Sequence, residues 1–186
     1  MRTAILGWRE TLAASLGANV TVPLECDESP RAPHFTGRPG WDGFGALVLW
    51  AAYAEHPGMP RPATLPEEWD DDTALVHCNA EGFRSRFSHL VRNVELWLPA
   101  PLQFTFEGED VDGRRLVMGS AETLARQLAE LNGATWKVKP DEVAGWARRA
   151  PPPDASLEVG ARYAFAVLSD LSAKAVEHRL PMKLDF

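Results

Sequence analysis

Apolar residues recur along the chain with two different periods, which predict helices over most of its length and strands near its middle. Spacings of three and four are typical of amphipathic helices. They predict helices over residues 3–16, 80–93, 121–131 and 157–179, with a shorter helix opening at Pro140. Residues 44–55 are apolar on nearly every side, which is typical of a buried helix. We therefore expect this helix to form the densest part of the core, with Asp42 as its N-cap.

Between residues 94 and 118 the apolar period changes to two, which is typical of strands. The alternation covers residues 94–98 and 102–107 and returns at 116–118. Asp112-Gly113 lies between the last two segments and is a strong signal for a tight turn. The sequence therefore predicts a hairpin over about 102–118 at the centre of a sheet.

Two further segments are predicted to extend this sheet or to lie at its edge. Residues 20–24 alternate, but Pro23 has no N–H for a ladder bond, so this strand belongs at an edge. The tail, 180–186, is apolar at every second position and is expected to dock as an added strand. Together these elements predict an α+β fold, in which several helices pack on a small, mainly antiparallel sheet.

Length and composition limit the organisation and the compartment. A chain of 186 residues can bury one sizeable core, and only one helix and a tail follow the Pro151–Pro153 run, so we expect a single domain over 1–186. Charged residues come early and no apolar run reaches about 18 residues, which predicts neither a signal peptide nor a membrane span. Cys26 and Cys78 form no Cys-x-x-Cys pair. We expect a cytoplasmic protein, and its many Arg, Ala and Pro residues are associated with GC-rich bacterial genomes.

Charge and aromatic content narrow the classes of partner. The net charge of −7 argues against a general nucleic-acid binder, which needs a basic face to displace counterions. Seven tryptophans are many for this length, and they supply either core mass or exposed rings for binding. The sequence therefore predicts no nucleic-acid or membrane partner, and leaves a protein partner or a small polar ligand.

The loop before the buried helix holds the densest collection of residues that binding sites use. These residues, which lie within one nine-residue stretch, are His34, Arg38, Trp41 and Asp42. A histidine shuttles protons near neutral pH, an arginine binds carboxylates or phosphates, and a tryptophan supplies a stacking wall. Asp27, Glu28 and His56 join this candidate site if the loop folds back on itself. The alternative is structural: Arg38 pairs with Asp42, and Trp41 fills the core.

Two other groups of residues carry possible metal chemistry. The run Asp70–Asp72 could hold a hard cation, although runs of like charge are usually solvated. His77 and Cys78 could be metal ligands or a nucleophile pair, but adjacent residues do not face each other on a helix. Because no complete metal-binding or catalytic motif is present, we expect no metal and no cofactor.

These observations leave two hypotheses for function. The first is a non-catalytic binding module, for example a toxin-neutralising protein, and it follows from the acidic charge, the tryptophans and the missing catalytic signature. The second is a small hydrolase-like or ligand-binding enzyme that uses the 34–42 loop. In that enzyme His34 is the acid–base group, Arg38 holds an anion and Trp41 forms the wall.

Overall fold

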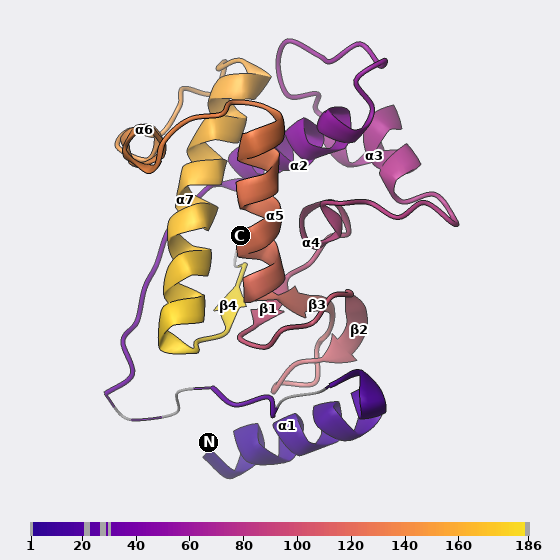
Figure 1. Ribbon diagram of the computed structural model, residues 1–186, viewed down its shortest axis with the longest axis vertical. Coiled ribbons are helices and arrows are strands. Elements are labelled where there is room, and N and C mark those ends of the chain that lie inside the picture. Colours follow the sequence, from indigo (N-terminus) through magenta and orange to yellow (C-terminus); the bar gives the residue numbers. More distant parts are fainter. Residues whose placement is uncertain (1, 21–22, 27–28, 30, 185–186) are drawn as a thin grey trace.

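The computed structural model describes residues 2–20, 23–26, 29 and 31–184, and it confirms the predicted α+β class (Figure 1). The helices are α1 (Arg2–Leu16), α2 (Trp41–Glu55), α3 (Thr73–Cys78), α4 (Ser88–Val91), α5 (Ala121–Ala134), α6 (Pro140–Trp146) and α7 (Leu157–His178). The strands are β1 (Leu96–Leu98), β2 (Phe106–Glu109), β3 (Arg115–Ser120) and β4 (Met182–Lys183). Two short 3-10 turns, η1 (Gly17–Asn19) and η2 (Trp69–Asp71), complete the regular elements.

The four strands lie in the order β2-β3-β1-β4. The predicted hairpin is present as β2 and β3, which pair antiparallel around a turn where Gly113 has a φ of 79°, although its first strand begins at Phe106 and not at 102. The tail adds β4 antiparallel to β1, as expected. The hairpin is not the centre of the sheet, however, because the central pair is β1 and β3, which run parallel. Thr21 and Val22, in the strand expected over 20–24, lie outside the described residues.

Helix α2 is the buried helix that the sequence predicts. Every residue from Gly43 to Tyr53 is buried. The helix begins earlier than expected, since Gly40 occupies the N-cap with a φ of 71°. Asp42 is therefore not the cap, and its carboxylate lies in the first turn, where the helix dipole favours a negative charge.

The core is divided by the sheet into two clusters. The larger cluster lies between α2, α5, α7 and one face of the sheet. It includes an aromatic group in which Trp136 stacks on Trp50 at 5.3 Å and meets Trp146 and Phe165 edge-on. The smaller cluster lies on the other face, where α1 covers the sheet (Figure 1). Since α7 packs in the larger cluster, the residues after Pro151–Pro153 join the same body as the rest.

The helix predicted over 80–93 is wrong. In its place the structure has an irregular segment after α3, with a turn in which Gly82 has a φ of 82°, followed by the short helix α4. Asn79, expected as an N-cap, is the C-cap of α3. The Glu55 carboxylate accepts hydrogen bonds of 2.6 Å from Ser85 Oγ and from the Arg86 backbone N–H. A backbone N–H that donates to a carboxylate cannot donate to a helical carbonyl, so the chain leaves the helical path here.

Buried His89 joins α4 to α5 and to the sheet. Its backbone N–H donates to Gln127 Oε1 at 2.9 Å, and its carbonyl accepts from Trp97 Nε1 at 3.2 Å. Its ring lies against Gly119, where a Cβ would come within 2.6 Å of the imidazole. Burial, and secondarily the charge of Arg126, lowers the pKa of His89 to about 4. The ring is therefore neutral in the folded protein at neutral pH.

We expect Gly45→Ala to destabilise the fold by about 1–2 kcal/mol, because the new Cβ would lie 2.5 Å from the Trp69 ring. The matched control is Gly133→Ala in α5, where a Cβ meets nothing within 4 Å. This control should gain about 0.5–1 kcal/mol from the higher helix propensity of alanine. Urea denaturation measures the free energy of unfolding of both variants. Equal changes in the two variants would contradict the close contact of Gly45 with Trp69.

We also expect the free energy of unfolding to fall as the pH drops from about 6.5 towards 4. In that interval the unfolded chain binds a proton at His89 and the folded protein does not, at a cost of about 2–3 kcal/mol. Urea denaturation gives the free energy of unfolding of the wild type and of His89→Gln at pH 7 and pH 4.5. The difference between the two proteins isolates the contribution of His89, because all other groups titrate in both proteins. If the variant loses as much stability as the wild type, His89 is not its source.

Candidate functional site

A groove of about 1040 Å³ lies between the segment 33–41, the C-terminal half of α7 and residues 180–184. Figure 1 shows the segment running alongside α7 on its way to α2. The apolar side chains of the groove come from α7 and from the C-terminal strand region: Leu168, Leu171, Ala175, Leu180, Met182 and Leu184. The groove therefore has an apolar floor, and one wall is the loop that the sequence singles out.

The segment 33–41 is held against α7 by specific contacts although it has no regular structure. A Cβ on Gly37 would lie 2.8 Å from Val167 Cγ1, so only glycine allows this approach. Tyr163 Oη donates a 3.1 Å hydrogen bond to the Arg38 carbonyl. Phe35 stacks on His178 with 5.2 Å between ring centroids. These contacts fix the backbone of the wall and thereby the shape of the groove.

The structure brings together three of the predicted site residues and separates the others. His34, Arg38 and Trp41 line the groove. Asp42 is exposed in the first turn of α2, and it is not among the residues that line the groove. His56 is the C-cap of α2, about 20 Å along the helix from Trp41, where its ring meets His77 edge-on. Asp27 and Glu28 lie outside the described residues.

Trp41 does not fill the core, in contrast to the structural alternative. Half of its side chain is exposed, whereas the other six tryptophans are buried or partly buried. Its ring lies 5.0 Å from that of buried Trp69, which supports it from behind. Among the described residues no ion pair joins Arg38 to Asp42 either.

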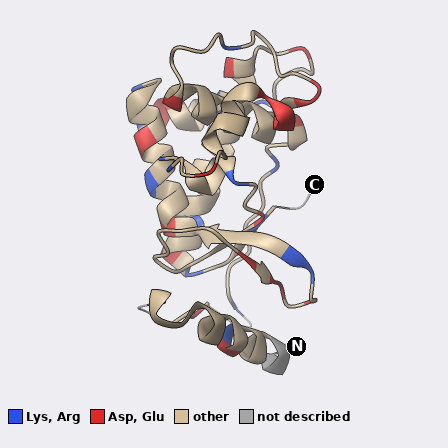
Figure 2. Ribbon diagram, turned by 90° about the vertical axis from the view of Figure 1, so that its right-hand side faces the viewer, with Lys and Arg blue, Asp and Glu red and all other residues tan. Residues whose placement is uncertain are grey.

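The charges around the groove are mostly neutralised locally. Three cationic side chains near it form ion pairs: Lys174 with Asp170 at 2.6 Å, Arg179 with Glu25 at 2.9 Å and Lys183 with Asp110 at 3.0 Å. Figure 2 shows acidic and basic residues interspersed over the helices and the sheet rather than gathered on separate faces. The ion pairs leave the groove with few charges available to a ligand.

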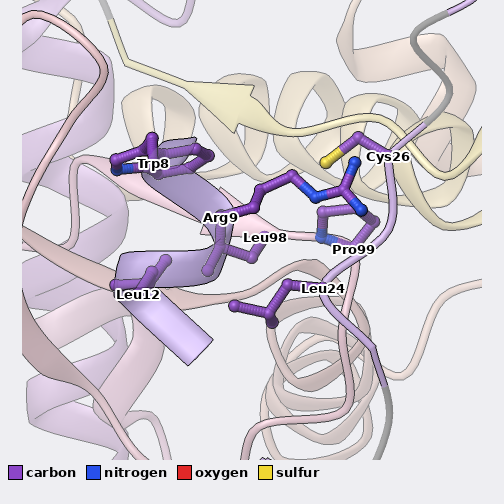
Figure 3. Close-up of a pocket in the computed structure, with 7 residues that line it drawn as sticks. All are labelled: Trp8, Arg9, Leu12, Leu24, Cys26, Leu98 and Pro99. Atoms are coloured by element: carbon purple, nitrogen blue, oxygen red, sulfur yellow. The ribbon is translucent and has the colours of Figure 1, made fainter. Parts of the chain in front are cut away.

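A second cavity lies between α1, the segment 23–26 and the end of β1 (Figure 3). Its volume is about 10 Å³, roughly the space of a single water molecule. The side chains around it are Trp8, Arg9, Leu12, Leu24, Cys26, Leu98 and Pro99. This cavity is too small for a ligand and belongs to the packing of α1 on the sheet.

His77 and Cys78 do not form a nucleophile pair. Cys78 is fully buried at the end of α3, whereas His77 is exposed. Burial, followed by the charge and the hydrogen bond of Glu55, raises the pKa of the Cys78 thiol to about 12. The thiol therefore stays protonated at physiological pH and is a poor nucleophile.

The aspartates of the acidic run have separate surroundings. Asp72 caps α3 by accepting a 2.8 Å hydrogen bond from the Ala74 N–H, and it also accepts one from Tyr53 Oη. Asp70 and Asp71 are exposed in η2. Within the described part of the chain, no three His, Cys, Asp or Glu side chains gather in a way that could hold a metal ion.

The sequence did not predict the apolar floor of the groove. Leu168 and Leu171 were expected only as core positions of a long helix, and the tail only as an added strand. The helical spacing of Leu168 and Leu171 and the alternation of the tail indicate burial, but they do not show which neighbour covers each residue. The groove exists because the segment 33–41 crosses α7, which is a tertiary contact between residues more than 100 positions apart.

Comparison with models of known protein families, with curated proteins and with solved structures gives no match for this chain. None of the helices in the described residues is long and apolar enough to cross a membrane. The groove is therefore the feature from which a function can be inferred.

We expect the two cysteines to differ sharply in reactivity. Partly buried Cys26 should react with a thiol reagent such as dithionitrobenzoate in the native protein, whereas Cys78 should react only on unfolding. Counting released thiolate with and without urea measures this, and the Cys26→Ser variant assigns the reactive group. Rapid release of two equivalents from the native protein would contradict the burial of Cys78.

Proposed function

We propose that the protein is a non-catalytic binding module that receives an extended segment of a partner protein in the groove beside Trp41. The observation that carries this proposal is an exposed tryptophan at the end of an apolar groove. Tryptophan is enriched among the residues that dominate binding energy at protein interfaces, where it is buried on association. A toxin-neutralising protein is one example of this class.

Trp41 suits such a role because its side chain is already held in place, so it would lose little conformational entropy on binding. It is the first residue of α2, and its ring packs against Trp69. Trp69 is itself fixed by Phe44, 6.5 Å away edge-on, and by the close approach to Gly45. A rigid anchor loses less conformational entropy on binding than a mobile one.

The shape of the groove favours a chain segment over a compact ligand. Its volume of about 1040 Å³ is at the upper end of the range of roughly 300–1,000 Å³ for small-molecule sites. The wall is formed along its whole length by the segment 33–41, and the floor spans about two turns of α7. A mainly apolar groove that is bordered by nine consecutive residues, 33–41, suits an extended peptide whose alternate side chains point into it.

The enzyme hypothesis has less support. A histidine that acts as a general base is usually oriented by a third group. His34 is exposed, and none of the hydrogen bonds or ion pairs of the described residues reaches its ring. A residue placed in this way can contact a ligand, but its geometry offers no reason for catalysis.

We expect Trp41→Ala to weaken binding of the partner by about 2 kcal/mol or more, roughly thirtyfold. The control is Val76→Ala, because Val76 is exposed to a similar degree, 54% against 50%, but lies on α3 away from the groove. Tagged wild-type protein, Trp41→Ala and Val76→Ala are used as baits in a native-host lysate. Dissociation constants are then measured for any protein captured by the wild type.

The proposal predicts a protein that the wild type and Val76→Ala retain equally and that Trp41→Ala loses. It is overturned if every captured protein binds all three baits alike, or if the wild type captures none. Thermal unfolding of the variants checks that the fold is intact, and Trp41→Ala should unfold close to the wild type because its side chain is half exposed.

A further inference from the structure

Arg38 is the cationic side chain in the wall of the groove that the fold leaves available. Its backbone is fixed, since its carbonyl accepts from Tyr163 Oη and the preceding glycine is wedged against Val167. Its guanidinium is exposed and forms no hydrogen bond or ion pair with any described residue. Lys174, Arg179 and Lys183, which also lie near the groove, are each paired with a carboxylate of the protein itself.

An apolar segment that filled the groove would remove water from around this guanidinium. Burying an unpaired charge is costly, and the cost is offset only when the incoming group brings an opposite charge with hydrogen bonds. The arginine fork presents parallel N–H donors that match the two oxygens of a carboxylate. One arginine fork in the wall suits a monoanion, whereas phosphorylated segments are usually read by several arginines.

We infer that the partner segment carries an aspartate or glutamate whose carboxylate binds Arg38, with apolar side chains on either side of it that occupy the floor. This inference rests on the proposed function and names the chemistry of the partner. The acidic residue gives the groove its specificity, and the contacts with half-buried Leu171 and Leu180 and with Trp41 supply the apolar part of the affinity.

The test is a random library of peptides of about nine residues displayed on phage, which matches an extended stretch of roughly 30 Å. It is selected separately against the wild type, Arg38→Gln and Lys174→Gln. Lys174 is the matched control, because its ammonium lies 5.1 Å from the ring of Phe35 beside the groove but is already paired with Asp170. Arg38→Lys serves as a further variant, since it keeps the charge and loses the fork.

Peptides selected on the wild type should be enriched in Asp or Glu flanked by apolar residues, and the enrichment should persist with Lys174→Gln and vanish with Arg38→Gln. Individual peptides should bind Arg38→Gln about tenfold or more weakly than the wild type, with Arg38→Lys in between. Replacing the acidic residue of a peptide by its amide should cause a similar loss on the wild type and little loss on Arg38→Gln.

The other outcomes separate this inference from the proposed function. Peptides that lose binding with Trp41→Ala but show no acidic enrichment would overturn the role of Arg38 and leave the groove as a protein-binding site. If no selected peptide depends on Trp41, both proposals are overturned. In that case saturable binding of octanoate that depends on Arg38 would identify a small amphipathic anion as the occupant, and a dimer dissociated by Arg38→Gln would identify a second copy of the chain.

Discussion

At the crossing of α2 and α7 the two helices meet through glycine and alanine. A Cβ on Gly160 would lie 3.0 Å from Ala46 Cβ, and one on Gly43 would lie 3.7 Å from Ala164 Cβ. Small residues let the two backbones approach closely, and the larger apolar side chains pack around this contact. The packing of α2 on α7 fixes the position of the first turn of α2. The segment 33–41 has to pass along α7 to reach that point, and the groove forms between them.

The same helix connects the core to the exposed anchor of the groove. Gly45 is buried in α2, and the missing side chain leaves the space that the Trp69 ring occupies. Trp69 in turn supports Trp41 at the start of the helix, where half of that side chain faces solvent. A larger residue at position 45 would displace Trp69 and remove the support of Trp41. The packing of Trp69 and the position of Trp41 therefore depend on one buried glycine, although Gly45 does not line the groove.

Elements that depend on local patterns could be predicted from the sequence. Helix α2, the hairpin and β4 follow from hydrophobic period and turn residues. The helix expected over 80–93 fails because the carboxylate of Glu55, some thirty positions earlier, binds the backbone there. The parallel pairing of β1 with β3 could not be foreseen, since the alternation of a strand does not specify its neighbour. For the site, the local clustering of polar and aromatic residues identified His34, Arg38 and Trp41, which line the groove. His56 lies at the opposite end of α2, so the length of that helix separates it from them.

The net charge of −7 and an acidic partner segment are compatible because the two act over different distances. At physiological ionic strength the Debye length is about 8 Å, so exposed charges further away are largely screened from a bound segment. Near the groove Lys174, Arg179 and Lys183 are already paired with carboxylates, whereas no described residue forms an ion pair with the guanidinium of Arg38. In the proposed complex the total charge influences the rate of encounter, and the charge of Arg38 selects the segment that can be desolvated in the groove. The proposed specificity therefore follows from which ion pairs the described residues form among themselves.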